Sequence, residues 1–153
     1  MTPPTTKTPE NPTNEASEAV PLPEGEQPLL VILDSHGIIF RSYYALRDIL
    51  PPTRTQEPIS AVYGYANSLL TVFRELKPTH VIAAWDASAS TFRKAKDERY
   101  KATRDATPDD LLPQFDRIRE MLEAFRIPLV EKAGYEADDV LGTLAEQAHE
   151  QGM

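Results

Sequence analysis

The sequence predicts an α/β fold with a parallel sheet of about three strands and helices on both faces. Two runs, LLVILD at 29–34 and THVIAAWD at 79–86, are continuously apolar and end in an acid, as strands buried on both faces do. A third strand-like run, IPLVE, follows at 127–131. Helical patterns separate the three runs, and strands that alternate with helices indicate a parallel sheet. The 153 residues are enough for one such domain.

The first 28 residues differ in composition from this domain. They contain seven of the fourteen prolines, abundant threonine and glutamate, and almost no large apolar side chain. Such a segment cannot offset the entropy of ordering by burial. We therefore expect a disordered tail at 1–28 and one domain at 29–153.

Helical patterns connect the expected strands. The segment 38–48 is helix-like, and 50–58 holds three prolines and is expected to be a loop. From Ile59 to Leu76 apolar residues recur at helical spacing. The next helix is expected at 107–126, with Thr107 as N-cap and proline at the first helical position. Its expected buried stripe consists of Leu111, Leu112, Phe115, Ile118, Met121, Leu122 and Phe125.

The last helix is expected at 136–151, between a turn at Gly134 and a stop at Gly152. Only Met153 follows, where a further strand would be expected to begin. Because a three-stranded parallel sheet with an unfinished edge is unusual for a natural domain, we expect a truncated piece of a longer protein.

The composition excludes several kinds of site. No cysteine is present, which excludes disulfides, thiolate metal sites and cysteine nucleophiles. The apolar runs fall far short of the roughly 20 residues of a membrane helix, and the net charge of −8 favours solubility. We expect His36 to be a turn histidine with a local hydrogen bond, with contact to a phosphate as the alternative, and Trp85 to be a core residue.

Five carboxylates are expected at one rim of the sheet. Asp34 and Asp86 end two strands, and Glu136, Asp138 and Asp139 follow the third strand at the start of the last helix. The carboxyl ends of parallel strands meet at one edge, which is where such sheets bind ligands. A set of oxygen ligands suits a hard divalent cation, Mg²⁺ or Mn²⁺.

Each of these acids alone has a simpler explanation. An acid at a helix N-terminus is favoured by the helix dipole by roughly 0.3–1 kcal/mol, and an aspartate can end a strand because a turn begins there. The convergence of three distant segments is what favours a metal site over helix capping.

A basic segment, RKAKDERYKATR at 93–104, follows Asp86. It carries Arg93, Lys94, Lys96, Arg99, Lys101 and Arg104 against two acids, a local charge of +4. A solvated helix face is the simple explanation. Beside a metal site, however, its cations and the aromatic Tyr100 are placed to neutralise a phosphodiester and to stack on an unpaired base.

Several motifs together resemble a known family. They are LDSHGIIFRSYYAL, AVYGYANSLL, KPTHVIAAWDASASTFR, ERYKATRDATPDDL and GYEADDVLGTLA. In order and spacing they are similar to the N-terminal half of the 5'→3' exonuclease domain of bacterial DNA polymerase I, which belongs to the flap endonuclease group. The resemblance covers residues 29–153 and implies a nuclease core of the PIN-like or resolvase-like type with a helical arch.

The resemblance also implies roles for individual residues. The acidic metal positions of the family fall on Asp34, Asp86, Glu136, Asp138 and Asp139. Arg41 falls on a basic residue near the substrate phosphate. Arg93, Tyr100, Lys101 and Arg104 fall on the arch that a 5' single strand passes, and Lys101 matches the lysine that assists at the scissile phosphate.

In this family, Mg²⁺-dependent hydrolysis removes RNA primers and displaced 5' flaps during DNA replication and repair. The implied partners are DNA at a 5' flap or a single-strand/duplex junction, an RNA primer, and a polymerase domain later in the gene. A cytoplasmic, nucleoid-associated bacterial protein is implied, with no membrane partner.

The chain departs from the family pattern in two ways. Ser35 stands where the family usually has glycine, a change expected to tighten the turn beside the metal. A later strand with further metal-binding aspartates and a helix-hairpin-helix element are absent from these 153 residues. Two hypotheses stay open. The first is a 5' nuclease fold that is weak or inactive as this chain, and the second is a non-catalytic module or broken gene product that keeps the front half of the fold and at most binds nucleic acid or a partner.

Overall fold

The computed structural model describes residues 27–87 and 106–153. The tail expected at 1–28 lies almost wholly outside these residues, and the basic segment 93–104, to which the arch was assigned, lies entirely outside them. Within the described part of the chain, no helix has both the length and the apolar character that a membrane crossing requires.

The centre of the domain is a three-stranded parallel sheet in the order β1-β2-β3, as predicted. The strands are β1 (Leu30–Asp34), β2 (His80–Trp85) and β3 (Leu129–Glu131). In the register of the first pair, Asp34 lies opposite Ala84. Because β2 is central and β1 is at an edge of this sheet, β2 is more deeply buried than β1, in which only Leu33 is fully buried.

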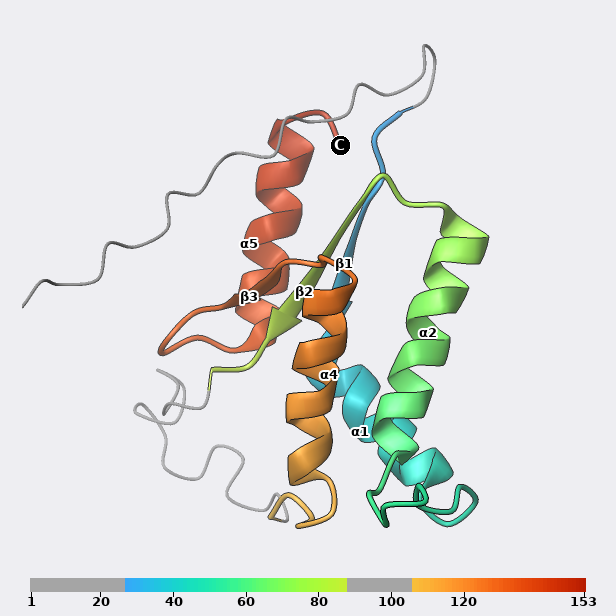
Figure 1. The fold of residues 1–153 in the computed structure, drawn as a ribbon. Helices are drawn as coiled ribbons and strands as arrows, with labels where there is room; N and C mark the ends of the chain where they lie inside the picture. Colours follow the sequence, from blue (N-terminus) through green and yellow to red (C-terminus); the bar gives the residue numbers. More distant parts are fainter. Residues whose placement is uncertain (1–26, 88–105) are drawn as a thin grey trace, which may run out of the picture.

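Helices cover both faces of the sheet, as the fold class predicts (Figure 1). On one face lie α1 (Ser35–Leu46), α2 (Ser60–Leu76) and α4 (Leu112–Ala124), and on the other lies α5 (Ala137–Glu150). The larger core fills the first face and includes Leu33, Ile39, Tyr43, Tyr65, Leu69, Trp85, Ile118 and Leu122. The second core is built from smaller residues, with Ala84, Ala137 and Val140 at its centre.

Helix α1 begins earlier than predicted. We expected it at 38–48, but it follows β1 without a loop and starts at Ser35. Asp34 is its N-cap, and the Asp34 side chain accepts a hydrogen bond from the Gly37 N–H at 3.1 Å. This cap satisfies one of the unpaired donors of the first turn, so strand and helix can join directly.

Helix α4 begins later than predicted. Thr107 is not its N-cap, because the helix starts at Leu112 and its cap position, Leu111, makes no side-chain cap bond. The residues before it form a turn in which the Leu111 N–H donates to the Pro108 carbonyl at 3.0 Å. Pro113 explains the boundary, since a residue without an N–H is tolerated in the first turn and not in the helix interior.

The stripe predicted for α4 is partly correct. Leu111, Ile118 and Leu122 are buried, and Phe115 and Met121 pack against the same core. Leu112 and Phe125, by contrast, are 52% and 48% exposed. Leu112 is the first residue of the helix and Phe125 is its C-cap.

The remaining elements agree closely with prediction. Helix α2 starts within one residue of the expected position, and its first turn is closed by Gln114 of α4, whose Oε1 accepts the Ala61 N–H at 2.7 Å. Gly134 and Gly152 have φ angles of +85° and +81°, the left-handed conformation that the predicted turn and stop require.

Candidate functional site

The segments that carry the predicted acids, the ends of β1 and β2 and the start of α5, lie at one end of the sheet. Asp34 ends β1 opposite Ala84, which precedes Asp86 by two residues. The start of α5 reaches the same end, since the Ala137 N–H donates to Asp86 Oδ1 at 2.6 Å. Three segments that are distant in the sequence therefore meet here, which is the arrangement a shared site requires.

Asp34 is held locally. Its Oδ1 accepts the Gly37 N–H, and a Cβ atom on Gly37 would lie 2.2 Å from Asp34 Oδ2. Glycine at position 37 therefore makes room for this carboxylate.

Ser35 does not tighten a turn, because no turn is present between β1 and α1. It is the fully buried first residue of α1, and its Oγ lies 3.0 Å from the Tyr65 hydroxyl. Burial raises the pKa of Tyr65, the Ser35 hydrogen bond opposes this rise, and the nearby Asp34 carboxylate adds to it. Tyr65 was not among the predicted site residues, although it lies four residues after Ala61 on the buried face of α2.

His36 makes a long-range contact where a local one was expected. Its Nδ1 accepts the backbone N–H of Asp86 at 3.2 Å, across 50 residues of sequence. The same Nδ1 is 3.9 Å from Asp86 Oδ2, which is close enough for an ion pair. The shorter bond decides between the two, because a nitrogen that accepts an N–H carries no proton and cannot form the ion pair.

The ring of His36 also contacts two aromatic side chains. Its centroid lies 5.1 Å from that of Trp85 in an edge arrangement and 5.3 Å from that of Phe115. Trp85 is buried, as predicted, and Arg119 stacks on its ring at 4.4 Å. The imidazole is therefore packed between the end of β2 and α4.

The acids of α5 form a capping box. The Glu136 side chain accepts the backbone N–H of Asp139, and Asp139 Oδ2 accepts the Glu136 N–H at 3.0 Å. Glu136 is only 5% exposed, whereas Asp138 is exposed to solvent. The simpler explanation for this cluster, helix capping, therefore holds for Glu136 and Asp139.

The described acids suit a metal site with one or two protein carboxylates and not a site made by three or more side chains. Among residues 27–87 and 106–153, no three His, Asp or Glu side chains are grouped closely enough to hold a cation between them. Mg²⁺, however, is commonly held by one or two carboxylates, with waters and substrate phosphate completing its octahedron. Asp34 and Asp86 each engage Oδ1 in a backbone bond, so Oδ2 is the oxygen each can offer.

The predicted contacts to nucleic acid are only partly described. Arg41 is exposed on α1, seven residues after Asp34, which places it about 10 Å along the helix from the rim. The structure gives it no ion pair with another described residue. Arg93, Tyr100, Lys101 and Arg104 lie outside the described residues, so their roles stay predictions.

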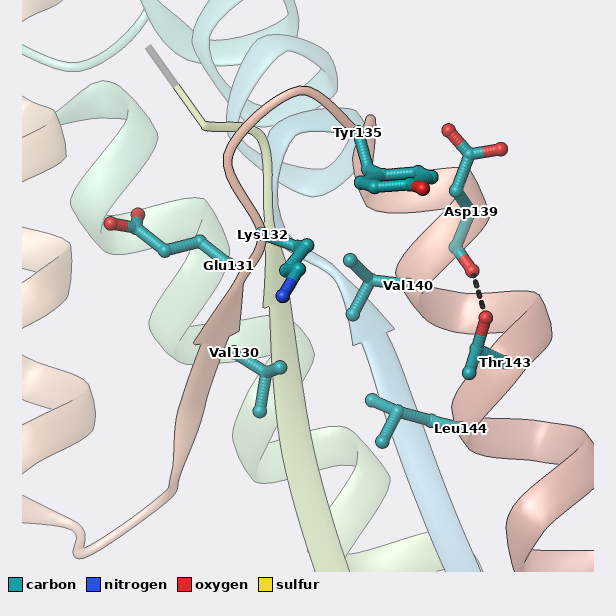
Figure 2. Close-up of a pocket in the computed structure, with 8 residues that line it drawn as sticks. All are labelled: Val130, Glu131, Lys132, Tyr135, Asp139, Val140, Thr143 and Leu144. Atoms are coloured by element: carbon teal, nitrogen blue, oxygen red, sulfur yellow. Dashed lines mark hydrogen bonds between the residues drawn. The ribbon is translucent and has the colours of Figure 1, made fainter. Parts of the chain in front are cut away.

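A pocket of about 380 Å³ lies between β3 and α5, beside the rim (Figure 2). Val130, Val140 and Leu144 give it an apolar lining, and Asp139 is the only predicted site residue among those that line it. In Figure 2 the Asp139 carboxylate points away from Lys132 and Val130. The pocket therefore shares one residue, Asp139, with the acidic rim.

Comparison with known proteins identifies the family. Residues 29–153 match the family model described as the 5'-3' exonuclease, N-terminal resolvase-like domain. The chain is 44% identical over 126 residues to DNA polymerase I of Chloroflexus aurantiacus, covering 82% of this chain and 13% of that protein. For DNA polymerase I of Mycobacterium tuberculosis the identity is 39% over 134 residues, covering 88% of this chain and 15% of the relative.

DNA polymerase I of Rhizobium leguminosarum is 42% identical over 132 residues, covering 80% of this chain and 13% of the relative. The chain thus spans about one seventh of the length of these proteins. The matched residues include all the described helices and strands and the motifs from which the resemblance was inferred. The chain belongs to the family of 5'-3' exonuclease N-terminal resolvase-like domains.

Proposed function

We propose that this domain takes part in metal-dependent 5'→3' hydrolysis of phosphodiester bonds in DNA, with Mg²⁺ or Mn²⁺ bound at the rim of Asp34, Asp86 and the first turn of α5. The observation that carries the proposal is the 2.6 Å bond from the Ala137 N–H to Asp86. It joins the end of one strand to the acidic start of a distant helix, which supports a site shared by these two segments.

A cation at this rim would polarise a phosphate oxygen and lower the pKa of a bound water. The chain's own residues would do the rest. Asp34 and Asp86 are fixed through Oδ1 and present Oδ2, while Glu136 and Asp139 fix the start of α5. Arg41 is exposed on α1, where its guanidinium can pair with a phosphate further along the strand.

Substrate and partners follow from the family. We propose DNA at a 5' flap or a single-strand/duplex junction as substrate, with an RNA primer as an alternative 5' strand. Arg93, Tyr100, Lys101 and Arg104 are proposed to contact that strand, with Lys101 nearest the scissile phosphate. Because the relatives are DNA polymerases I, we propose that the domain works in one polypeptide with a polymerase.

One observation favours a second candidate, a non-catalytic module that binds nucleic acid. The described residues provide no group of three metal-ligating side chains, and two of the five acids already serve as a capping box. We therefore expect weak or no hydrolysis by this chain alone.

Calorimetric titration with Mn²⁺ tests the metal site. The wild-type chain is expected to bind at millimolar concentration, and Asp86→Ala to abolish binding. Asp48→Asn is a matched control, because Asp48 is an 83% exposed acid that pairs only with its neighbour Arg47 among the described residues. Absence of binding, or binding that does not depend on Asp86, would contradict the metal site.

A cleavage assay on a labelled 5'-flap substrate then separates the two candidates. A nuclease should produce metal-dependent cleavage that Lys101→Ala reduces without changing Mn²⁺ affinity. Metal binding and DNA binding without cleavage, at high enzyme concentration, would favour the non-catalytic module.

A further inference from the structure

We propose that His36 is a positioning residue for Asp86. In this role its Nδ1 holds the Asp86 main chain at the end of β2, so that the Asp86 carboxylate stays directed at the start of α5. The consequence for metal affinity rests on the function proposed above. The positioning itself is a property of the protein without metal.

The first support is the hydrogen bond to the backbone. Asp86 lies one residue beyond the end of β2, and the last paired residue of that strand is Trp85. Among the described residues, therefore, no strand partner accepts the Asp86 N–H, and the acceptor is His36 Nδ1 at 3.2 Å. A partly buried N–H needs such an acceptor, because an N–H without a hydrogen bond is not compensated for the free energy of its desolvation.

The second support is the packing of the imidazole. The side chain of His36 is 20% exposed and contacts the rings of Trp85 and Phe115 at centroid distances of 5.1 Å and 5.3 Å. The residue before it, Ser35, is fully buried and paired with Tyr65 of α2. A ring fixed from both sides can hold the backbone of another segment in one place.

The third support is that Asp86 is tied at two points. His36 holds its N–H, and the Ala137 N–H holds its Oδ1 at 2.6 Å. One tie comes from the start of α1 and the other from the start of α5. Loosening the first tie should therefore weaken the second, because both restrain the same residue.

The test compares three substitutions at position 36 in the full chain. His36→Asn keeps an acceptor atom bonded to Cγ, where Nδ1 is in histidine. His36→Gln moves its acceptor one bond further out, and His36→Ala has none. The readout is amide hydrogen exchange at Ala137 without divalent metal, with the amide of Leu69 in the core of α2 as a control for global unfolding.

We expect exchange at Ala137 to be roughly three- to tenfold faster in His36→Ala and His36→Gln, the size of one lost hydrogen bond. His36→Asn should stay near the wild-type rate, and Leu69 should be unchanged in all three. Wild-type exchange at Ala137 in His36→Gln would overturn the proposal. So would equal acceleration in His36→Asn and His36→Gln, because the acceptor position would then not matter.

A spectroscopic signature adds a second readout. Nitrogen-15 spectra of the wild-type histidines should show Nδ1 of His36 unprotonated and Nε2 protonated at neutral pH, because an accepting Nδ1 leaves the proton on Nε2. The opposite tautomer would overturn the proposal, since a protonated Nδ1 cannot accept the Asp86 N–H.

Mn²⁺ titration of the same variants separates this inference from the proposed function. If the function is correct, His36→Gln should weaken Mn²⁺ binding and His36→Asn should restore it. If the wild-type chain binds no Mn²⁺ while the exchange ranking holds, the metal site fails and the positioning role stands. If Mn²⁺ binds but the three variants do not differ in amide exchange or in Mn²⁺ affinity, the positioning role is contradicted and the metal site is not.

Discussion

Asp34 and Asp86 occupy equivalent positions at the ends of adjacent strands, but they are held in different ways. Asp34 accepts an N–H from Gly37, three residues further along the same segment. Asp86 accepts an N–H from Ala137, 51 residues away on a helix that covers the other face of the sheet. One pattern in the sequence, an acid after a buried strand, therefore produces a local helix cap in one case and a tertiary link in the other.

Gly37→Ala should break the local cap with the largest effect. The new Cβ would lie 2.2 Å from Asp34 Oδ2, so either the carboxylate or the start of α1 must move. We expect a loss of up to about 3 kcal/mol in the free energy of unfolding, the upper range for overpacking. Urea denaturation measures this change.

Gly142→Ala is the matched control for that substitution. Gly142 lies inside α5, and a Cβ there meets nothing within 4 Å. Alanine should therefore stabilise the protein by roughly 0.5–1 kcal/mol, as it does in other helix interiors. If Gly37→Ala stabilised the protein as Gly142→Ala is expected to do, the close contact between Asp34 and Gly37 would be contradicted.

Asp86→Ala should break the tertiary link with a smaller effect. The Ala137 N–H is buried and would lose its acceptor, which should cost about 1–2 kcal/mol, the usual range for a lost N-terminal cap. Asp86→Asn retains an oxygen at the same place and should recover most of that stability. Thermal unfolding without divalent cations measures both, and equal losses would show that the charge matters more than the hydrogen bond.

Tyr65→Phe, beside Asp34, should have the smallest effect of these substitutions. It removes one buried hydrogen bond to Ser35, which should lower the free energy of unfolding by about 1 kcal/mol. Burial and the Asp34 carboxylate raise the pKa of Tyr65 above its ordinary value of 10.0. The unfolded chain therefore releases this proton first, and stability should be flat below about pH 10 and fall above it. Tyr65→Phe should reduce that fall.

Tyr43 is the control for this pH dependence. Its hydrogen bond to Asp110 also raises its pKa, so both tyrosines contribute to the alkaline loss of stability. Tyr43→Phe should remove the contribution of Tyr43 to the alkaline loss of stability and leave the contribution of Tyr65. Urea denaturation at several pH values measures the alkaline loss of stability in each variant. If that loss were as large in Tyr65→Phe as in the wild type, the burial of the Tyr65 hydroxyl near Asp34 would be contradicted.

The parts of the fold that depend on local pattern could be predicted from the sequence. Continuous apolar runs identified all the described strands, and helical spacing placed α2 within one residue. The predicted start of α1 was wrong because Asp34 was expected to begin a turn, whereas it is the N-cap of the helix. The start of α4 was wrong because Thr107 and Pro108 form a plausible helix start, whereas Pro113 sets the boundary.

The candidate site was predictable only in outline. Parallel strands required Asp34 and Asp86 to lie at one edge, and the acids of α5 followed from connectivity. The links that fix the site carry no local signal. His36 bonds to Asp86 across 50 residues and Ser35 pairs with Tyr65 across 30, and both contacts exist only after α1 and α2 have packed on the sheet.

The position of α5 determines how the sheet can grow. Helices α1, α2 and α4 cover one face as the chain moves from β1 to β3, whereas α5 covers the other (Figure 1). Connections between parallel strands are almost always right-handed, so a helix on the opposite face leads back across the sheet. A parallel strand added after α5 would pair with the outer side of β1, and the order of strands would reverse beside Asp34, where doubly wound sheets open a crevice for their ligands.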